Sequence, residues 1–118
     1  MGWLSRLRRY FTQPDEDRLA EETLAWADSV PGTVRISACP SREPVRIAGL
    51  VGRLRLRPMD GTVSLEAEIS DGTGEVTAAW MGRSSIKGLS LGSRIVLEGV
   101  LSPDRERLRM VNPRFEFA

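Results

Sequence analysis

Apolar and polar side chains alternate along several short segments of this 118-residue chain. The alternation is cleanest in residues 63–70, whose apolar members are Val63, Leu65, Ala67 and Ile69. A period of two places successive side chains on opposite faces of a β-strand, so each segment has one face suited to burial. Several short segments of this kind predict a mainly β protein.

The same pattern predicts five strands, at residues 45–57, 63–70, 75–81, 94–101 and 107–112. Asp60-Gly61 and Asp71-Gly72 separate the first three segments, and such dipeptides are a strong hairpin signal. In the first segment the apolar phase changes after Gly52, which indicates a bulge or a sharp bend. We therefore expect a five-stranded Greek-key barrel of the oligonucleotide/oligosaccharide-binding (OB) type.

An N-terminal helix is expected before the strands, at residues 14–29. Pro14 and the three acids that follow it are typical of a helix start, and Pro31-Gly32 ends the helical pattern. An apolar stripe that includes Leu19 and Trp26 is expected to pack on the main body. We divide the chain into residues 1–32, a basic arm and amphipathic helix, and residues 33–118, the barrel.

Composition argues against an enzyme. The chain has no histidine, which removes the common nucleophile–base pairs and most zinc ligand sets. Its single cysteine, Cys39, has no second thiol for a disulfide or a metal, which favours a reducing compartment. No apolar run approaches the length of a membrane span. We expect a cytoplasmic, non-catalytic protein without a metal or cofactor.

The net charge of +1 hides an uneven distribution. Residues 1–9 carry three arginines, whereas residues 15–28 carry six acids and one arginine. Residues 33–118 hold thirteen basic and ten acidic residues. This balance is less basic than that of most proteins that bind nucleic acid without sequence preference.

Several segments of the predicted barrel resemble a known family in order and spacing. They are Ile69-Ser-Asp-Gly-Thr-Gly-Glu-Val76, Trp80-Met81, Gly92-Ser-Arg-Ile-Val-Leu-Glu-Gly99 and Met110-Val-Asn-Pro113-Arg-Phe-Glu116. They are similar to the wedge OB domain of the helicase RecG and to small stand-alone actinobacterial OB-fold proteins, over about residues 45–117.

The resemblance implies binding of branched DNA without ATP hydrolysis, because the motor domains are missing. In the family an aromatic residue near the end of the third strand stacks on DNA, and Trp80 and Met81 match that position. Gly82 stands where the family has an asparagine.

The pairing register of the first hairpin offers the arginines of the first strand a structural role, as an alternative to phosphate binding. A two-residue turn at Asp60-Gly61 sets Arg55 opposite Glu66 and Arg53 opposite Glu68. Salt bridges across the strands explain these arginines slightly better than a phosphate-binding stripe does, because the two glutamates would repel phosphates.

Counting in the same way across Asp71-Gly72 sets Val63 opposite Trp80 and points Trp80 into the interior. This favours a core role, although a place at the rim would leave base stacking open. Arg107 and Arg109 should lie beside the third strand with no acid opposite them. The candidate nucleic-acid-binding residues are Arg53, Arg55, Arg57, Trp80, Met81, Arg83, Lys87, Arg105, Arg107 and Arg109.

The leading hypothesis is a protein that binds single-stranded or branched DNA, with RNA as an open alternative, on the face of strands two, three and five and the adjacent loops. The alternative is a protein–protein interaction module that has lost nucleic-acid binding. In that case the contact surface is the N-terminal arm, where Trp3 and Leu4 precede Arg6, or the helix.

Overall fold

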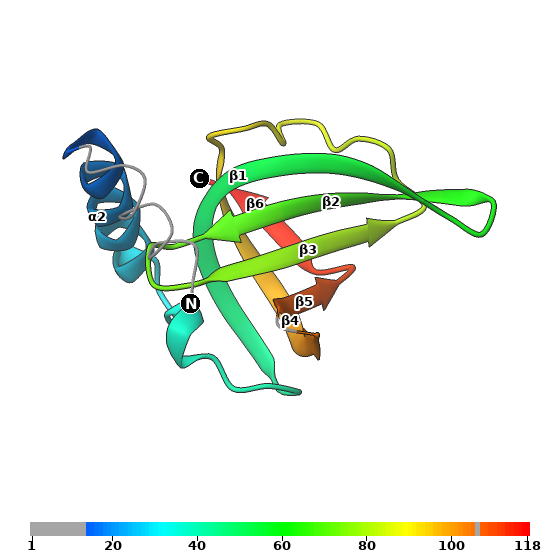
Figure 1. The fold of residues 1–118 in the computed structure, drawn as a ribbon. Coiled ribbons are helices and arrows are strands. Elements are labelled where there is room, and N and C mark those ends of the chain that lie inside the picture. The colour runs from blue at the N-terminus through cyan, green and yellow to red at the C-terminus, as the bar shows by residue number, and fades with distance from the viewer. Residues whose placement is uncertain (1–13, 106) are drawn as a thin grey trace.

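A computed structural model describes residues 14–105 and 107–118 (Figure 1). The predicted N-terminal helix is confirmed, and so are the five strands predicted from the alternation. A 3-10 helix and a sixth strand were not predicted. The arm at residues 1–11 lies outside the described residues. In chain order the elements are α2 (Pro14–Ser29), η1 (Ile36–Ala38), β1 (Pro44–Met59), β2 (Thr62–Ser70), β3 (Glu75–Met81), β4 (Arg94–Asp104), β5 (Arg107–Val111) and β6 (Arg114–Phe117).

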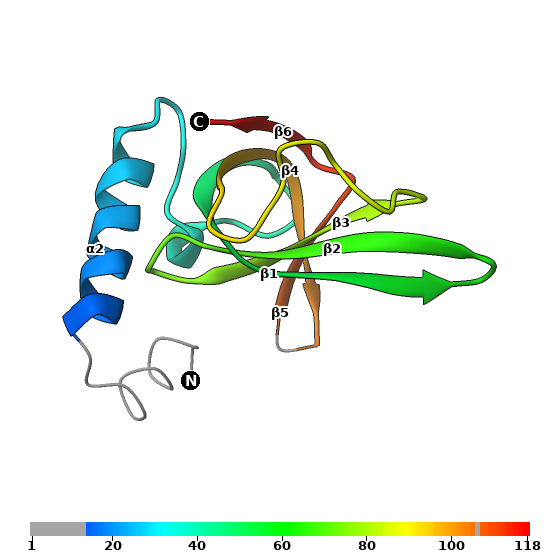
Figure 2. The same ribbon diagram turned by 90° about the horizontal axis from the view of Figure 1, so that it is seen from above.

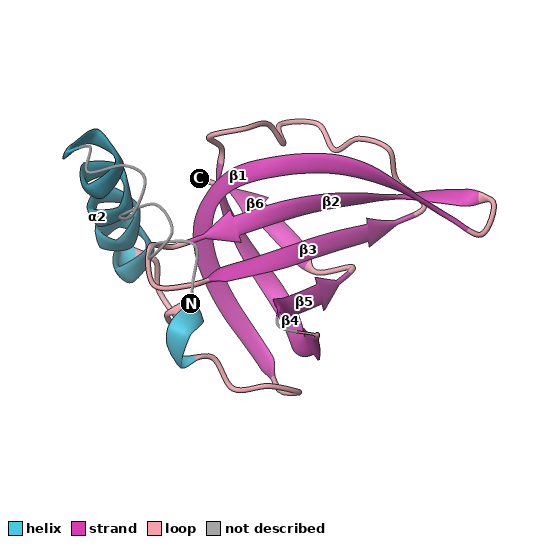
Figure 3. Ribbon diagram, in the orientation of Figure 1, coloured by secondary structure: helices cyan, strands magenta, loops and turns pink. Residues whose placement is uncertain are grey.

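Five strands form a closed ring in the order β1-β2-β3-β5-β4, closed by pairing between β4 and β1. β3 and β5 run parallel, and the other neighbours are antiparallel. β6 pairs with the first half of β4. From above, α2 lies on one side of the ring and the β1–β2 hairpin projects on the other (Figure 2). The long connection from β3 to β4 has no regular structure (Figure 3).

β1 pairs with both β4 and β2 because it bends. Its register against β2 shifts between Val51 and Arg53, which confirms the bulge predicted at Gly52. Close to this point the strands come together so tightly that a Cβ on Gly49 would lie 2.7 Å from the Ser70 carbonyl oxygen. A residue without a side chain is therefore required where β1 passes from β4 to β2.

The β1–β2 hairpin has the predicted register. Asp60 and Gly61 both have positive φ, at 43° and 82°, as a type I′ turn requires. Arg55 is consequently opposite Glu66. The predicted inward phase after Gly52 is also correct, but the hairpin extends past the ring, so Leu56 remains 53% exposed.

The predicted register between β2 and β3 is wrong by two residues. Trp80 lies opposite Leu65, not Val63, because the connection is a four-residue loop at 71–74. The buried Asp71 carboxylate holds this loop by accepting from the backbone N–H groups of Thr73 and Gly74. Its other oxygen accepts from the N–H of Ile36 at 2.8 Å. A shift of two residues keeps every side chain on its predicted face.

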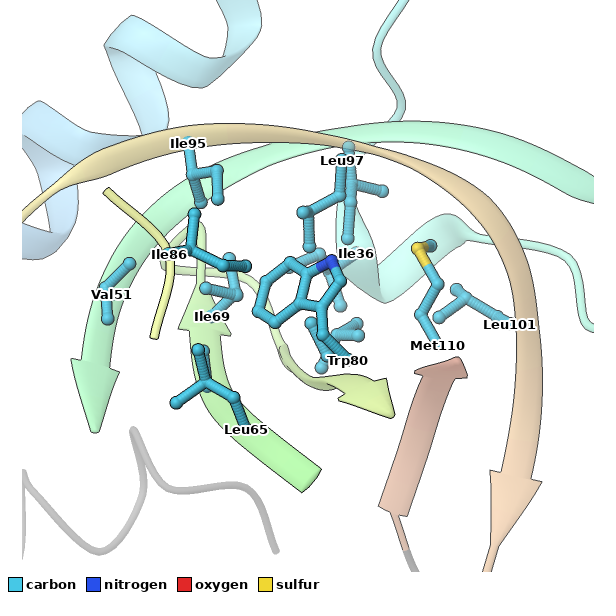
Figure 4. Packing of buried hydrophobic residues seen from close by; sticks show 14 residues of the cluster. Ile36, Val51, Leu65, Ile69, Trp80, Ile86, Ile95, Leu97, Leu101 and Met110 are labelled. Atoms are coloured by element: carbon cyan, nitrogen blue, oxygen red, sulfur yellow. The ribbon is translucent and has the colours of Figure 1, made fainter. Parts of the chain in front are cut away.

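Trp80 belongs to the core, as the hairpin register favours, and the stacking role that made it a candidate site residue is not supported. The residue is 3% exposed, and its Nε1–H donates to the Pro113 carbonyl at 3.1 Å. The Phe115 ring packs edge-on against it with 5.6 Å between centroids. Figure 4 shows the indole among aliphatic side chains from the ring strands and from Ile36. A ring buried this way has no free face for a base.

α2 packs on the ring through its last two turns. Ala27 contacts Ala48 and Val96, which confirms that the helix docks on the main body. The Arg94 guanidinium lies 5.1 Å from the centre of the Trp26 ring, a cation–π contact. Leu19, predicted to be part of the apolar stripe, is 48% exposed because the packed face of the helix runs through Ala20, Thr23 and Ala27 instead.

We expect Asp71→Ala to lower the free energy of unfolding by about 2–4 kcal/mol, because the buried N–H of Ile36 and those of the loop would lose their acceptor. Urea unfolding followed by circular dichroism measures this change. Glu21→Ala, which removes an exposed carboxylate of α2, is the control and should change the value by less than about 0.5 kcal/mol. Equal effects of the two substitutions would contradict the role of Asp71.

Candidate nucleic-acid interface

The outer face of β1, β2, β3 and β5 carries a lattice of charged side chains. Five arginines surround two glutamates, which leaves three positive charges in excess. We call this set the arginine lattice. Its members are Arg53, Arg55, Arg57, Glu66, Glu68, Arg107 and Arg109.

Glu66 lies at the centre of the arginine lattice and its side chain is only 1% exposed. Arg55 donates from Nε to its Oε1 at 2.9 Å. Arg109 places Nη1 3.0 Å from Oε2, and Arg57 places Nη1 3.6 Å from the same oxygen. A buried carboxylate is stable only when paired in this way, so these three arginines compensate the buried charge of Glu66.

Glu68 forms ion pairs with arginines on both sides of the same face, one on β1 and one on β5. Its Oε1 lies 3.2 Å from Nη1 of Arg107, and its Oε2 lies 3.5 Å from Nε of Arg53. The prediction that Arg107 and Arg109 have no acid opposite them is therefore wrong. The side chains of Thr77 and Ala79 on the intervening strand are short, so glutamates on β2 reach across β3 to arginines on β5.

The cross-strand alternative weighed for Arg53 and Arg55 is confirmed, because both form ion pairs with the predicted glutamates. Burial of the Glu66 carboxyl raises its pKa, but the hydrogen bond from Arg55 and the nearby positive charges of Arg109 and Arg55 together outweigh burial. The pKa of Glu66 is therefore lowered from its ordinary value.

A groove with a volume of about 600 Å³ lies along the arginine lattice. Five arginines line it against a single acid, Asp104, and the remaining lining is Thr77 and Leu108. The arginines are Arg55, Arg57, Arg105, Arg107 and Arg109. Arg105 stands at the β4–β5 turn with φ of 60°, so the turn contributes a cation to the mouth of the groove. The groove is open, polar and cationic.

The structure gathers some predicted site residues in this groove and places others outside it. Met81 is exposed on the last position of β3, where its N–H donates to Oδ1 of Asn112. Arg83 and Lys87 are exposed in the β3–β4 loop and do not line the groove. Trp80 lies in the core. Arg53 belongs to the arginine lattice but does not line the groove. The candidate interface is therefore Arg55 and Arg57 of β1, Arg107 and Arg109 of β5, and Arg105 between β4 and β5.

Residues 14–105 and 107–118 contain no group of three His, Cys, Asp or Glu side chains arranged to hold a metal ion. Over the same residues, none of the helices has the length and apolar character needed to cross a membrane.

No family model and no curated protein sequence matches this chain. Among solved structures, the chain is similar to one from a replication protein A heterotrimer bound to single-stranded DNA. The TM-score is 0.50 at 10% sequence identity, and the match covers 81% of this chain and 75% of that chain. At such identity the likeness concerns the fold. These comparisons do not show the resemblance to the RecG wedge domain, which stays a prediction.

We expect Glu66→Gln to lower the free energy of unfolding at pH 7 by about 2–4 kcal/mol, since Arg109 would lose its buried counter-charge. A carboxyl with a lowered folded-state pKa stabilises the fold fully above its unfolded pKa of about 4.3, and this contribution is lost as the pH falls through the folded value. The difference between wild type and variant should therefore shrink below about pH 4.

Urea unfolding of both proteins between pH 7 and pH 3 tests this expectation, with Glu21→Gln on α2 as a control that should follow the wild type. A difference that stayed constant over the whole range would show that the charge of Glu66 is not what the arginines stabilise.

Proposed function

We propose that this chain is an OB-fold protein that binds single-stranded or branched nucleic acid in the groove of the arginine lattice. The observation that carries the proposal is the excess of guanidinium groups along one open groove. Five arginines line it, and together with the lining acid Asp104 and the paired Glu66 and Glu68 they still leave a net positive charge. Phosphates are the polyanionic ligand that such an arrangement fits best.

The position of the groove agrees with this function. OB folds bind oligonucleotides on the face of their second and third strands and in the loops that follow the first and fourth strands. Here the groove lies over Thr77 of β3 and is flanked by Arg57 near the β1–β2 turn and Arg105 at the β4–β5 turn. The structural likeness to a chain from a replication protein A heterotrimer bound to single-stranded DNA supports the same reading of the fold, though weakly at 10% identity.

The composition of the groove predicts how binding would work. Its lining contains no aromatic side chain, so guanidinium groups offer the surfaces for base contact. Affinity would come mainly from phosphate contacts, with little sequence preference and strong salt dependence. The proposal extends to branched DNA only through the RecG wedge resemblance. It includes a non-catalytic role and a cytoplasmic location.

We expect a labelled single strand of about 15 nucleotides to bind with a salt slope of about −2, the value for three neutralised phosphates of a single strand. Arg57→Ala with Arg105→Ala should weaken binding about tenfold and reduce the slope by about 1. Arg57 is chosen because it lies 3.6 Å from the Glu66 carboxylate, farther than Arg55 at 2.9 Å and Arg109 at 3.0 Å, so its removal disturbs the buried charge least. Arg105 is chosen because it lines the groove from the β4–β5 turn. Fluorescence anisotropy at several salt concentrations, with a forked duplex in parallel, measures both quantities.

The control is Arg18→Ala with Arg42→Ala, which removes the same charge away from the groove. Arg42 also matches Arg105 in having positive φ, at 64°. The control should bind as the wild type does. Absence of saturable binding at low salt, or equal loss in the two double variants, would refute the groove as a nucleic-acid site.

A further inference from the structure

The second half of β1 has an open edge. β1 pairs with β4 only as far as Leu50, whereas its pairing with β2 continues to the hairpin turn. Val51 still uses this edge, because its N–H donates to the carbonyl of Ser93 and its carbonyl accepts from the N–H of Gly92. Beyond Gly52, no strand or loop of the described residues pairs with the edge.

The hairpin register decides which backbone groups face this edge. Met59 and Thr62 flank a two-residue turn and form a hydrogen-bonded pair, and such pairs alternate along antiparallel strands. The N–H and C=O groups of Leu54 and Leu56 therefore point away from β2, toward the open side. Pro58 has the same orientation but no N–H, which ends the usable edge before the turn.

An apolar groove of about 450 Å³ runs along the same edge. On the β1–β2 side it is lined by Leu54, Leu56 and Leu65, and on the other side by residues of the β3–β4 loop, which runs beside β1 (Figure 1). The loop residues are Ser84, Ser85, Ile86 and Leu89. A backbone edge and an apolar groove together are what an extended peptide requires, because main-chain bonds supply affinity and the groove takes alternate side chains.

The opposite face of the edge is positively charged. Arg53, Arg55 and Arg57 alternate with Leu54 and Leu56, and the three guanidinium side chains are between 51% and 63% exposed. In a strand added to β1, one set of side chains would enter the apolar groove and the other would lie beside these arginines. The added strand should therefore alternate apolar residues with acids.

We propose that residues 53–57 of β1 bind an extended peptide segment, in which apolar residues alternate with aspartate or glutamate, by strand addition. The N-terminal arm of this chain does not have this chemistry, since residues 1–13 contain three arginines and no acid. A second copy paired through the same edge would bring the arginine rows of the two chains together. The acidic peptide of another protein fits both the charge and the groove.

The Leu54 and Leu56 side of this surface is separate from the proposed nucleic-acid groove. The two surfaces share only arginines. Leu56 is suited to the test because its side chain lines the apolar groove and is already half exposed, so its removal should not unfold the protein. Val100 on β4 is a matched control, an exposed aliphatic residue that does not line this groove.

The probe is a fluorescein-labelled peptide of about eight residues that alternates valine or leucine with aspartate or glutamate, titrated with the full chain. We expect saturable binding that Leu56→Ser weakens about tenfold, as the loss of a buried leucine contact implies, and that Val100→Ser leaves unchanged. N-methylation of alternate peptide amides should abolish binding, because it removes the main-chain donors of strand addition. Oligonucleotide binding should be the same for Leu56→Ser and the wild type.

Three results of the peptide titrations would overturn the proposal. They are no binding of the acidic peptide, equal binding of the N-methylated and unmodified peptides, and equal binding of a peptide with lysine in place of the acids. A dimer in light scattering that Leu56→Ser dissociates would also overturn it, because the edge would then be occupied by a second copy. Loss of oligonucleotide binding in Arg57→Ala with Arg105→Ala has no bearing on these outcomes, so the two proposals fail independently.

Discussion

The bend of β1 at Gly49 to Gly52 is the constraint on which the other features depend. At Gly49 the strand lies so close to the Ser70 carbonyl that no Cβ fits, and at Gly52 the register against β2 slips by one residue. These two glycines let one strand close the ring against β4 and then leave it to form a projecting hairpin. Beyond Leu50 the strand has no partner in β4, which begins at Arg94, so its second half keeps an open edge.

The slip at Gly52 also decides which side chains face outward. A one-residue slip reverses the faces of a strand, so after Gly52 the odd-numbered arginines occupy the outer face and the leucines the inner one. Arg55 then meets Glu66 across the hairpin, and the buried glutamate draws Arg109 from β5 to the same point. The arginine lattice is in this sense a consequence of a backbone irregularity at Gly52, the residue before its first arginine.

Local rules predict the parts of this structure that depend on local geometry. The pairing of Arg55 with Glu66 follows from counting outward from Asp60-Gly61, because a type I′ turn has only two residues. The same dipeptide at Asp71-Gly72 gives the wrong count, since the Asp71 carboxylate bonds the backbone of Ile36, 35 residues away. A contact between residues so far apart in the sequence leaves no periodic signal in it.

The candidate site also has a part that local geometry predicts and a part that depends on long-range contacts. The arginines of β1 are predicted with their glutamates, but the pairing of Arg109 with Glu66 depends on the parallel neighbours β3 and β5 and on a short side chain between them. The exposure of Leu56 also escapes prediction, because the phase of a strand says which face is inward and not how far the ring extends. β6 is only four residues long and follows Pro113 directly, too short a segment for an alternation to be recognised.

The two proposed surfaces meet at the arginines of β1, and this has a thermodynamic consequence. Arg107 and Arg109 can serve only the outer groove, because β5 lies on the far side of β3 from the open edge. Arg55 and Arg57 border both surfaces. If both ligands bind, each anion neutralises charge that the other requires, so each must weaken the other by the same factor. A peptide at the edge would thereby lower the affinity of the groove for nucleic acid through the arginines that the two surfaces share, and higher salt would reduce that coupling because it screens the shared charges.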